Sequence, residues 1–488
     1  MTVQLTEAAD AATTAPPPRR WLILTVIGLA QLMVVLDITV VNIALPSAQH
    51  DLGFSVPDRQ WVVTAYALAF GGLLLVGGRL SDLLGRRTTF IVGLIGFAVV
   101  SAVGGAAPGF GTLVAARAVQ GAFGALLAPS ALALLGTTFT DPRERRTALG
   151  VYTALAGAGG AVGLLLGGVL TEYVSWRWSL YVNVVFAVVA LIGALILLPR
   201  QRRDPAARLD VPGSLLAVAG LAGIVYGFSE ASTDGWGAAR TLGPIVAGVL
   251  LLTGFVFVER RVAHPLVPIS ILADRTRGGA YLGTLLGGVA AIGMFLLVTY
   301  YLQGVLGYSP LITGVAFLPF VGGAIVGANV VSNIALSRFG PRLVAPVGMV
   351  AAAVGVEWLA RLGVHTGYGL GVAPGLALIG LGVSSVLTTA FSLGPAGTAP
   401  ADTGVASALV NSGNQIGGSL GAALLNTIAA NATVSYLSMH PTTPAAASVH
   451  GDGVAFTVLA GILVVGAMLT GAVHRPRQGQ SASVRQAA

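Results

Sequence analysis

Hydrophobic residues in this chain occur in long runs that short polar segments interrupt. Fourteen runs of about 20 apolar residues, the length that crosses about 30 Å of hydrocarbon as a helix, lie between the charged segments. They span residues 21–45, 59–78, 88–107, 110–136, 147–170, 177–198, 211–229, 241–258, 279–306, 309–335, 343–362, 367–391, 403–430 and 453–473. This pattern predicts an all-α polytopic membrane protein with fourteen transmembrane helices.

The distribution of arginine predicts the topology, because Lys and Arg concentrate in cytoplasmic loops. The chain has no lysine, and 21 of its 26 arginines fall in segments on one side of the predicted helices. Arg59, Arg177, Arg240 and Arg361 fall on the other side, and Arg117 lies within a span. If the number of helices were wrong by one, the later arginines would change sides and this asymmetry would be lost. We therefore expect both termini in the cytoplasm.

Two pairs of similar short segments indicate an internal duplication. Residues 82–87 resemble 337–342 at an offset of 255, and the glycine-rich segment 159–163 resembles 417–421 at an offset of 258. Spans 1 to 6 then correspond to spans 9 to 14 in the same orientation, and spans 7 and 8 are an insertion. The predicted organisation is an N-terminal tail (1–20), a six-helix bundle (21–200), two inserted helices with linkers (201–276), a second six-helix bundle (277–474) and a C-terminal tail (475–488).

Composition excludes several classes of function. Only 9% of the residues are charged and 55% are hydrophobic, with mean hydropathy +0.85, whereas a soluble domain has roughly 25% charged residues. The absence of cysteine excludes disulfides, and the absence of lysine excludes a P-loop ATPase and a Schiff-base cofactor. The net charge of +8 is spread over many loops, which disfavours nucleic-acid binding. The six histidines lack the spacing of a metal site.

Three motifs carry a resemblance to a known family. Residues 36–46 (LDITVVNIALP), the loop 78–87 (GRLSDLLGRR) and residues 117–121 (RAVQG) resemble motifs of the fourteen-helix drug:proton antiporters of the major facilitator superfamily. The resemblance extends from residue 21 to about 473. It implies two parallel six-helix halves around a central site.

The fifth span partly matches the antiporter motif of that family. Gly159, Gly163, Gly167 and Gly168 keep its glycines, whereas Leu164 stands where the family has proline. A glycine stripe of this kind also serves general helix packing. Relatives that export divalent organic cations tend to carry an additional acid in the tenth helix, and span 309–335 has none. A neutral or singly charged amphiphile is therefore the expected substrate.

Asp37 and Arg117 are the candidate proton-coupling residues. An unpaired charge at bilayer depth costs several kcal/mol, so each of these side chains is expected to have a partner. Asp37 lies about 25 Å along the first helix and Arg117 about 10 Å into the fourth, which places them at similar depths. Helices 1 and 4 are neighbours in the family fold. We expect Asp37 to take up and release a proton under the influence of Arg117; the alternative is a static buried ion pair.

The loop motif after the second span is a candidate gate. Opposite charges at a helix end can form a latch between bundles, and the resemblance implies a gate that stabilises the outward-facing state. The same arginines also satisfy the positive-inside rule without any gating role. The residues assigned to this gate are Gly78, Arg79, Asp82, Gly85, Arg86 and Arg87.

Polar and amphipathic side chains within the spans are candidates for lining a substrate cavity. Each of them has the alternative of bonding to its own helix backbone. They are Asn42, Tyr66, Gln120, Tyr301, Asn411, Asn414 and Gln415.

Together these features predict a proton-coupled exporter of lipophilic drugs or antibiotics that works by alternating access. It is expected in the bacterial cytoplasmic membrane as a monomer, with a small lipophilic substrate, protons and the lipid bilayer as its partners, no nucleic acid, and the proton gradient in place of a cofactor. An importer, symporter or facilitator on the same fold is the alternative. A channel and a membrane enzyme are disfavoured, because the sequence shows neither polar rings nor a catalytic constellation.

Overall fold

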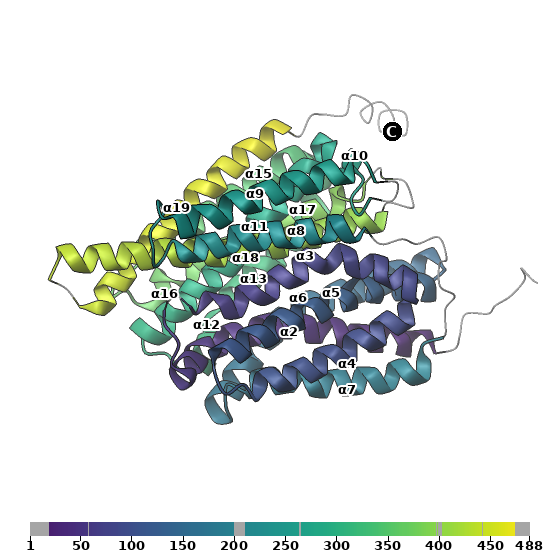
Figure 1. Ribbon diagram of the computed structural model, residues 1–488, viewed down its shortest axis with the longest axis horizontal. Coiled ribbons are helices and arrows are strands. Elements are labelled where there is room, and N and C mark those ends of the chain that lie inside the picture. The colour runs from purple at the N-terminus through teal and green to yellow at the C-terminus, as the bar shows by residue number, and fades with distance from the viewer. Residues whose placement is uncertain are drawn as a thin grey trace, which may run out of the picture.

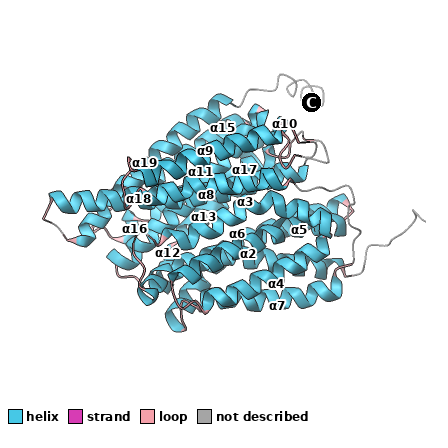
Figure 2. Ribbon diagram, in the orientation of Figure 1, coloured by secondary structure: helices cyan, strands magenta, loops and turns pink. Residues whose placement is uncertain are grey.

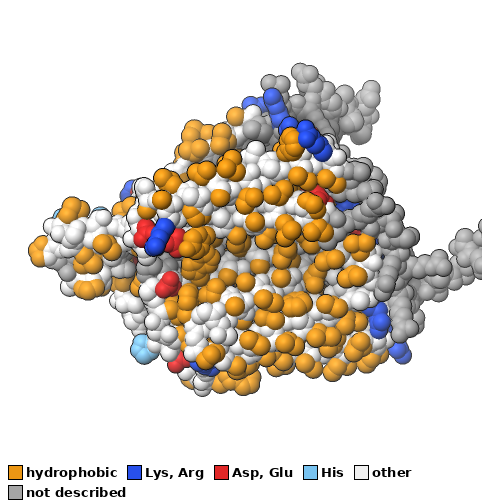
Figure 3. Space-filling view, in the orientation of Figure 1, with side chains coloured by type: hydrophobic (Ala, Val, Ile, Leu, Met, Phe, Trp, Pro, Cys, Tyr) orange, Lys and Arg blue, Asp and Glu red, His pale blue; other side chains and the backbone are white. Residues whose placement is uncertain are grey.

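The computed structural model describes residues 19–56, 58–199, 210–262, 265–396, 398, 403–441 and 443–473. Within these ranges the secondary structure is helical, with no strand (Figure 2). The helices lie side by side along one direction, from α2 (Arg20–Leu52) to α19 (Pro444–Val473) (Figure 1). Hydrophobic side chains cover the flank of the bundle in Figure 3, and the charged side chains visible there gather mainly toward its ends.

Six long helices make up the first half of the chain, and two more follow before the second half begins. After α2 come α3 (Gln60–Leu84), α4 (Arg86–Gly105), α5 (Phe110–Thr138), α6 (Pro142–Tyr173) and α7 (Trp178–Leu197). The inserted pair is α8 (Val211–Glu230) and α9 (Ala239–Glu259).

The second half begins with the short helix α10 (Ile269–Ala273). It continues with α11 (Arg275–Tyr300), η1 (Tyr301–Val305), α12 (Pro310–Ala316), α13 (Leu318–Val330), η2 (Val331–Ala335), α14 (Leu336–Phe339), α15 (Pro341–Leu359), α16 (Tyr368–Gly371), α17 (Ala373–Leu393), α18 (Thr403–Met439) and α19.

Thirteen helical segments in the described residues are long and apolar enough to cross a membrane. The fifth predicted span, 147–170, lies in α6, of which Ala158–Tyr173 is a shorter apolar stretch within the described residues. The predicted all-helical membrane fold is confirmed, and every predicted span lies on a helical segment.

Predicted spans 309–335, 403–430 and 453–473 differ from the observed helices. Span 309–335 is interrupted at Phe317, because Pro319 lacks the backbone N–H that a continuous helix requires. The last two helices extend beyond the apolar runs, α18 to Met439 and α19 back to Pro444, and project at the left of Figure 1. The polar residues between 431 and 452 end the hydrophobic pattern without ending the helices, since a helix outside lipid has no need of apolar side chains.

The same helix pairs pack in both halves. In the first half α3 packs on α5, α2 packs on α6 and α7, and α4 packs on α5 and α7. In the second half α13 packs on α17, α11 on α18 and α19, and α15 on α17 and α19. These pairs correspond one to one under the predicted repeat of spans 1 to 6 in spans 9 to 14. The inserted helices α8 and α9 pack on each other, and α8 also contacts α3 and α18.

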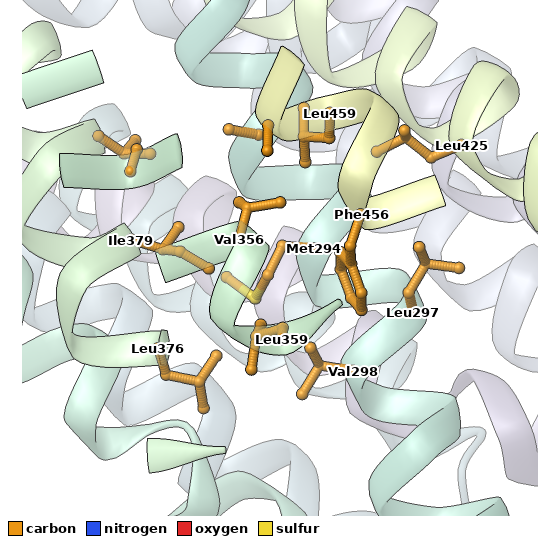
Figure 4. Packing of buried hydrophobic residues seen from close by; sticks show 14 of the residues in the cluster. Met294, Leu297, Val298, Val356, Leu359, Leu376, Ile379, Leu425, Phe456 and Leu459 are labelled. Carbon is orange, nitrogen blue, oxygen red and sulfur yellow. The ribbon is translucent and has the colours of Figure 1, made fainter. Parts of the chain in front are cut away.

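The second half has its own hydrophobic core. Phe456 and Leu459 of α19 lie near Val356 of α15, Ile379 of α17 and Met294 of α11 (Figure 4). A separate cluster that includes Phe90 and Phe97 fills the first half. Each half is therefore a packed unit rather than a shell around a cavity.

The two halves meet along α3 with α18 and along α6 with α12. We call the end where α2 begins the arginine-rich end, because Arg79, Arg87 and Arg143 lie there, and the other the opposite end. A third cluster, which joins Val41 and Ala44 of α2 to Leu296 of α11, holds the halves together toward the opposite end.

Glycine allows the closest helix contacts, which lipid alone does not drive because its tails are as apolar as the side chains. A Cβ at Gly77 of α3 would lie 1.9 Å from the carbonyl oxygen of Ala125 in α5. A Cβ at Gly417 of α18 would lie 1.9 Å from the carbonyl oxygen of Leu285 in α11. Backbone atoms cannot rotate away as side chains can, so these positions require glycine.

We expect Gly77→Ala to destabilise the protein by about 1–3 kcal/mol, because the added methyl group forces α3 and α5 apart. Thermal unfolding of the purified protein in detergent would report the change as a lower Tm. Gly111→Ala is the control, since a Cβ at Gly111 meets no atom within 4 Å. Equal Tm values for the two variants would contradict this account of the packing.

Candidate functional site

Asp37 is a fully buried carboxylate at the centre of a hydrogen-bonded network in the first half. Nη1 of Arg117 donates to its Oδ2 at 2.6 Å, so the contact expected from the sequence is present. Nε2 of Gln120 and Nδ2 of Asn183 each donate to its Oδ1 at 2.7 Å. Three donors from two other helices therefore surround this buried acid.

Arg117 is as deeply buried as its partner, with 2% of its surface exposed. Its Nε donates to the carbonyl oxygen of Val62 at 3.1 Å, and its Nη1 also donates to Oε1 of Gln120 at 2.7 Å. The guanidinium carbon lies 4.3 Å from the centre of the Tyr66 ring, a favourable cation–π distance. The cation is thus held by three kinds of contact, of which only one is the ion pair.

The packing of α5 brings these groups together. Arg117 and Gln120 are three residues apart, which places them on one helix face. Gly121 follows them, and a Cβ there would lie 2.3 Å from the carbonyl oxygen of Tyr66. The missing side chain lets α5 approach α3 closely enough for Arg117 to reach Val62 and Tyr66.

The cost of burying a charge explains why Asp37 and Arg117 each have several hydrogen-bond partners. Removing one member of a buried ion pair leaves an uncompensated charge in a medium that solvates it poorly, whereas the intact pair is close to neutral in its effect on stability. Protonation of Asp37 would cancel the charge that Arg117 faces. It would weaken the contacts that join α2 to α5 and α7, so the protonation state and the helix arrangement are physically linked.

The residues of the predicted gate lie at the arginine-rich end, where α3 meets α4. Nη2 of Arg79 donates to the carbonyl oxygen of Pro265, in the linker after α9, at 3.0 Å. Nη2 of Arg87 donates to the carbonyl oxygen of Leu195, near the end of α7, at 3.1 Å. The first contact reaches the inserted segment, and the second stays within the first half.

The other residues of the predicted gate shape the turn between the two helices. Gly85 joins α3 to α4 with φ +91°, a backbone conformation that favours glycine. Gly78 faces Pro129 at an ordinary contact distance, and Asp82 and Arg86 are partly buried on either side of the turn. The gating role of these residues stays a prediction.

The glycine motif of α6 faces two different neighbours. Gly159, Gly163 and Gly167 all pack against α2, and a Cβ at Gly167 would lie 2.9 Å from the Cα of Val40. Gly168 faces the other half, where its Cβ would lie 2.6 Å from the Cα of Leu311 in α12. Three of the four glycines therefore hold the first half together, and one lets the halves touch.

The candidate cavity residues of the first half are only partly satisfied, because the Tyr66 hydroxyl and Oδ1 of Asn42 are buried without a hydrogen-bond partner in the described structure. Tyr66 and Gln120 belong to the Asp37 network, as described. Nδ2 of Asn42 donates to the carbonyl oxygen of Ile38 at 2.8 Å, which is a bond within its own helix.

The candidates of the second half are distributed over two regions. The hydroxyl of Tyr301 donates to the carbonyl oxygen of Gly363 at 2.9 Å, near the opposite end. Asn411, Asn414 and Gln415 lie on α18, where Gln415 is buried beside Gly71 of α3 at the contact between the halves. A role in substrate binding stays a prediction for all seven residues.

The sequence reasoning did not include three members of the network. They are Asn183, whose amide bonds Asp37, Ser101, whose hydroxyl accepts from Nε2 of Gln120 at 2.8 Å, and the backbone carbonyl of Val62. Asn183 had a usable signal, because a buried amide in a strongly apolar helix needs a polar partner. Ser101 and Val62 had none, since a serine can bond its own helix and every residue has a carbonyl.

Comparison with known proteins shows relatives along nearly the full chain. It is 52% identical over 466 residues to the puromycin resistance protein pur8 of Streptomyces alboniger, covering 94% of this chain and 92% of that protein. It is 40% identical over 408 residues to the cephamycin export protein CmcT of Amycolatopsis lactamdurans, covering 83% and 84%. It is 38% identical over 415 residues to the tetracenomycin C resistance and export protein of Streptomyces glaucescens, covering 85% and 76%.

Solved structures share the fold. A bacterial homologue of the human lysosomal transporter Spinster, in an inward-facing and unoccupied conformation, aligns with TM-score 0.65 and 17% identity over 94% of this chain and 97% of that one. The human organic anion transporter MFSD10 aligns with TM-score 0.60 and 16% identity over 93% and 100%. Residues 27–422 match the Major Facilitator Superfamily. The chain therefore belongs to the Major Facilitator Superfamily, as its motifs predicted, and is a membrane transporter rather than an enzyme.

Proposed function

We propose that the protein exports lipophilic antibiotics across the bacterial cytoplasmic membrane in exchange for protons. Its two halves, residues 21–200 and 277–474, alternate access to a site between them, and both termini lie in the cytoplasm. The protein acts as a monomer in the lipid bilayer, with the proton gradient as its energy source and no cofactor.

The observation that carries this proposal is the similarity, over most of the chain, to three proteins whose names report antibiotic resistance or export. The high content of apolar residues within the spans suits a lipophilic substrate, and the lack of an acid in span 309–335 suits one with at most a single positive charge. Puromycin is the first compound to test, because pur8 is 52% identical to this chain.

The arrangement of the halves supports substrate entry from the arginine-rich end, which is the cytoplasmic end in this proposal. α6 packs on α12 near the opposite end, where a Cβ at Gly168 would lie 2.6 Å from the Cα of Leu311. A state closed at the opposite end is the one from which an exporter collects its substrate.

The Asp37 network supports the choice of a proton as the coupling ion. Its acid is buried and held entirely by residues of the first half, so its charge is balanced without a bound cation. Uptake of a proton would break the balance with Arg117 and loosen α2 from α5 and α7. Release would restore it, which gives the two states that antiport requires.

Asp37→Asn is expected to abolish coupled transport, because the amide keeps the shape of the side chain but cannot exchange a proton. In acid-loaded inside-out vesicles, puromycin should alkalinise the lumen with the wild type and leave it at the background of protein-free vesicles with the variant. Asp234→Asn is the matched control, since Asp234 is partly exposed and pairs with Arg240 at 3.9 Å. Unchanged proton release by Asp37→Asn would refute the coupling role.

Asn183→Leu tests whether the donors to Asp37 matter. Loss of the amide leaves Oδ1 with one donor fewer in a buried site, so we expect a loss of about 1–3 kcal/mol in stability and a matching fall in proton release. Tm and the vesicle assay would be measured together. Ser179→Ala, on the same helix, is the control, because the buried Ser179 hydroxyl has no hydrogen-bond partner in the described structure. If both variants behave like the wild type, Asn183 does not position Asp37.

A further inference from the structure

Arg59 is a second buried arginine, located at the opposite end, immediately before α3. Only 6% of its surface is exposed. The other arginines of that end reach solvent: 31% of the Arg177 side chain, 82% of Arg240 and 80% of Arg361 are exposed. Burying a guanidinium is costly unless partners compensate it, so the contacts of Arg59 are expected to have a structural or mechanical purpose.

The contacts of Arg59 are made with the other half. Its Nε donates to Oδ1 of Asn426 in α18 at 2.7 Å. Its guanidinium carbon lies 3.9 Å from the centre of the Tyr300 ring in α11. The hydroxyl of Tyr300 in turn donates to Oε1 of Gln49 in α2, so each half holds a side chain of the other.

A buried acid helps to compensate the charge of Arg59. Asp452 of α19, 7% exposed, faces Arg59 closely enough for their charges to attract. The cation therefore receives contacts from two helices of the second half, α11 and α18, and is attracted by the carboxylate of Asp452 in α19.

We propose that Arg59 is the lock that keeps the two halves closed at the opposite end, with Asn426, Tyr300 and Asp452 as its receptor. This inference rests on the proposed alternating access. Separation of α3 from α18 and α11 must break the hydrogen bond and the cation–π contact together, and water then solvates the guanidinium. The lock is reversible because the same charge is stable either in its receptor or in water.

The first turns of α3 connect this lock to the Asp37 network. Val62, whose carbonyl accepts from Arg117, lies three residues after Arg59, about 4.5 Å along the helix. Tyr66, whose ring faces the guanidinium of Arg117, lies one turn further along α3. A displacement of α3 that follows protonation of Asp37 would therefore move Arg59 relative to its receptor.

The test measures the opening of that end directly. The chain has no cysteine, so cysteines introduced at Val56 and Leu370, which are 48% and 84% exposed and belong to different halves, are the only sites for spin labels. Pulsed electron paramagnetic resonance on the full-length protein in proteoliposomes then gives the populations of short and long distances. The matched control for Arg59→Gln is Arg240→Gln, an exposed arginine of the same end.

We expect Arg59→Gln to raise the ratio of long to short distances on the order of tenfold, through loss of a desolvated cation–π contact and a charge-assisted hydrogen bond. Arg240→Gln should leave the ratio unchanged. Asn426→Asp should lower it, because a carboxylate in place of the amide turns the hydrogen bond with Arg59 into an ion pair. A general loss of packing would not produce opposite changes in these two variants.

Two results would overturn the lock, and they are distinguishable from a failure of the proposed function. If the wild type opens when puromycin or acid is added but Arg59→Gln and Arg240→Gln behave alike, alternating access stands and the lock is wrong. If the wild type keeps a single distance under every condition, both proposals fail. Should Arg59→Gln not fold, Tyr300→Leu removes the ring without changing the charge and must raise the ratio in the same direction.

Discussion

Close contact between helix backbones is the constraint on which the rest of this structure depends. Lipid provides no hydrophobic force between helices, so their association relies on dispersion contacts and hydrogen bonds, which require short distances. The 68 glycines of the chain make such distances possible. At Gly77 and Gly417, in opposite halves, even one methyl group would overlap a carbonyl of the facing helix.

The polar network follows from that packing. Arg117 reaches the carbonyl of Val62 and the ring of Tyr66 because Gly121 brings α5 against α3. The buried charge is then satisfied within one half, which leaves that half intact when the halves move relative to each other. In the proposed mechanism, a proton on Asp37 therefore alters the packing of α2 without exposing the site to the other half.

The charges of the two arginines that are buried in the described structure are compensated by different halves. Arg117 is compensated inside the first half, whereas Arg59 is compensated by the second half. Both depend on α3, which carries Arg59 and accepts the bond from Arg117, and both connect to α2 through Asp37 and Gln49. In the proposed mechanism, the contacts that α3 makes with both arginines link proton exchange in one half to closure between the halves.

The sequence by itself determined the helical membrane fold, the duplication and the pairing of Asp37 with Arg117. Apolar run length predicts the fold and arginine asymmetry predicts its topology, whereas the duplication rests on two pairs of similar segments. The pairing follows from the cost of an isolated buried charge together with the neighbouring helices that the family resemblance implies. The asymmetric roles of the α6 glycines, the break at Phe317 and the hydrogen bond that Ser101 accepts from Gln120 could not be predicted in this way.

Only the tertiary structure decided which groups meet across the bundle. In the sequence, Arg59 is one of four arginines on the side of the predicted helices that has few arginines. Its burial depends on contacts with Tyr300 and Asn426, which lie 241 and more residues away in the chain. Gly168 looked like its neighbours in the motif, yet it alone of the four contacts α12. Sequence patterns show which side chains of each helix must be buried. Which residues they contact is decided by how whole helices pack, because a rotation or shift of one helix changes every contact that it makes.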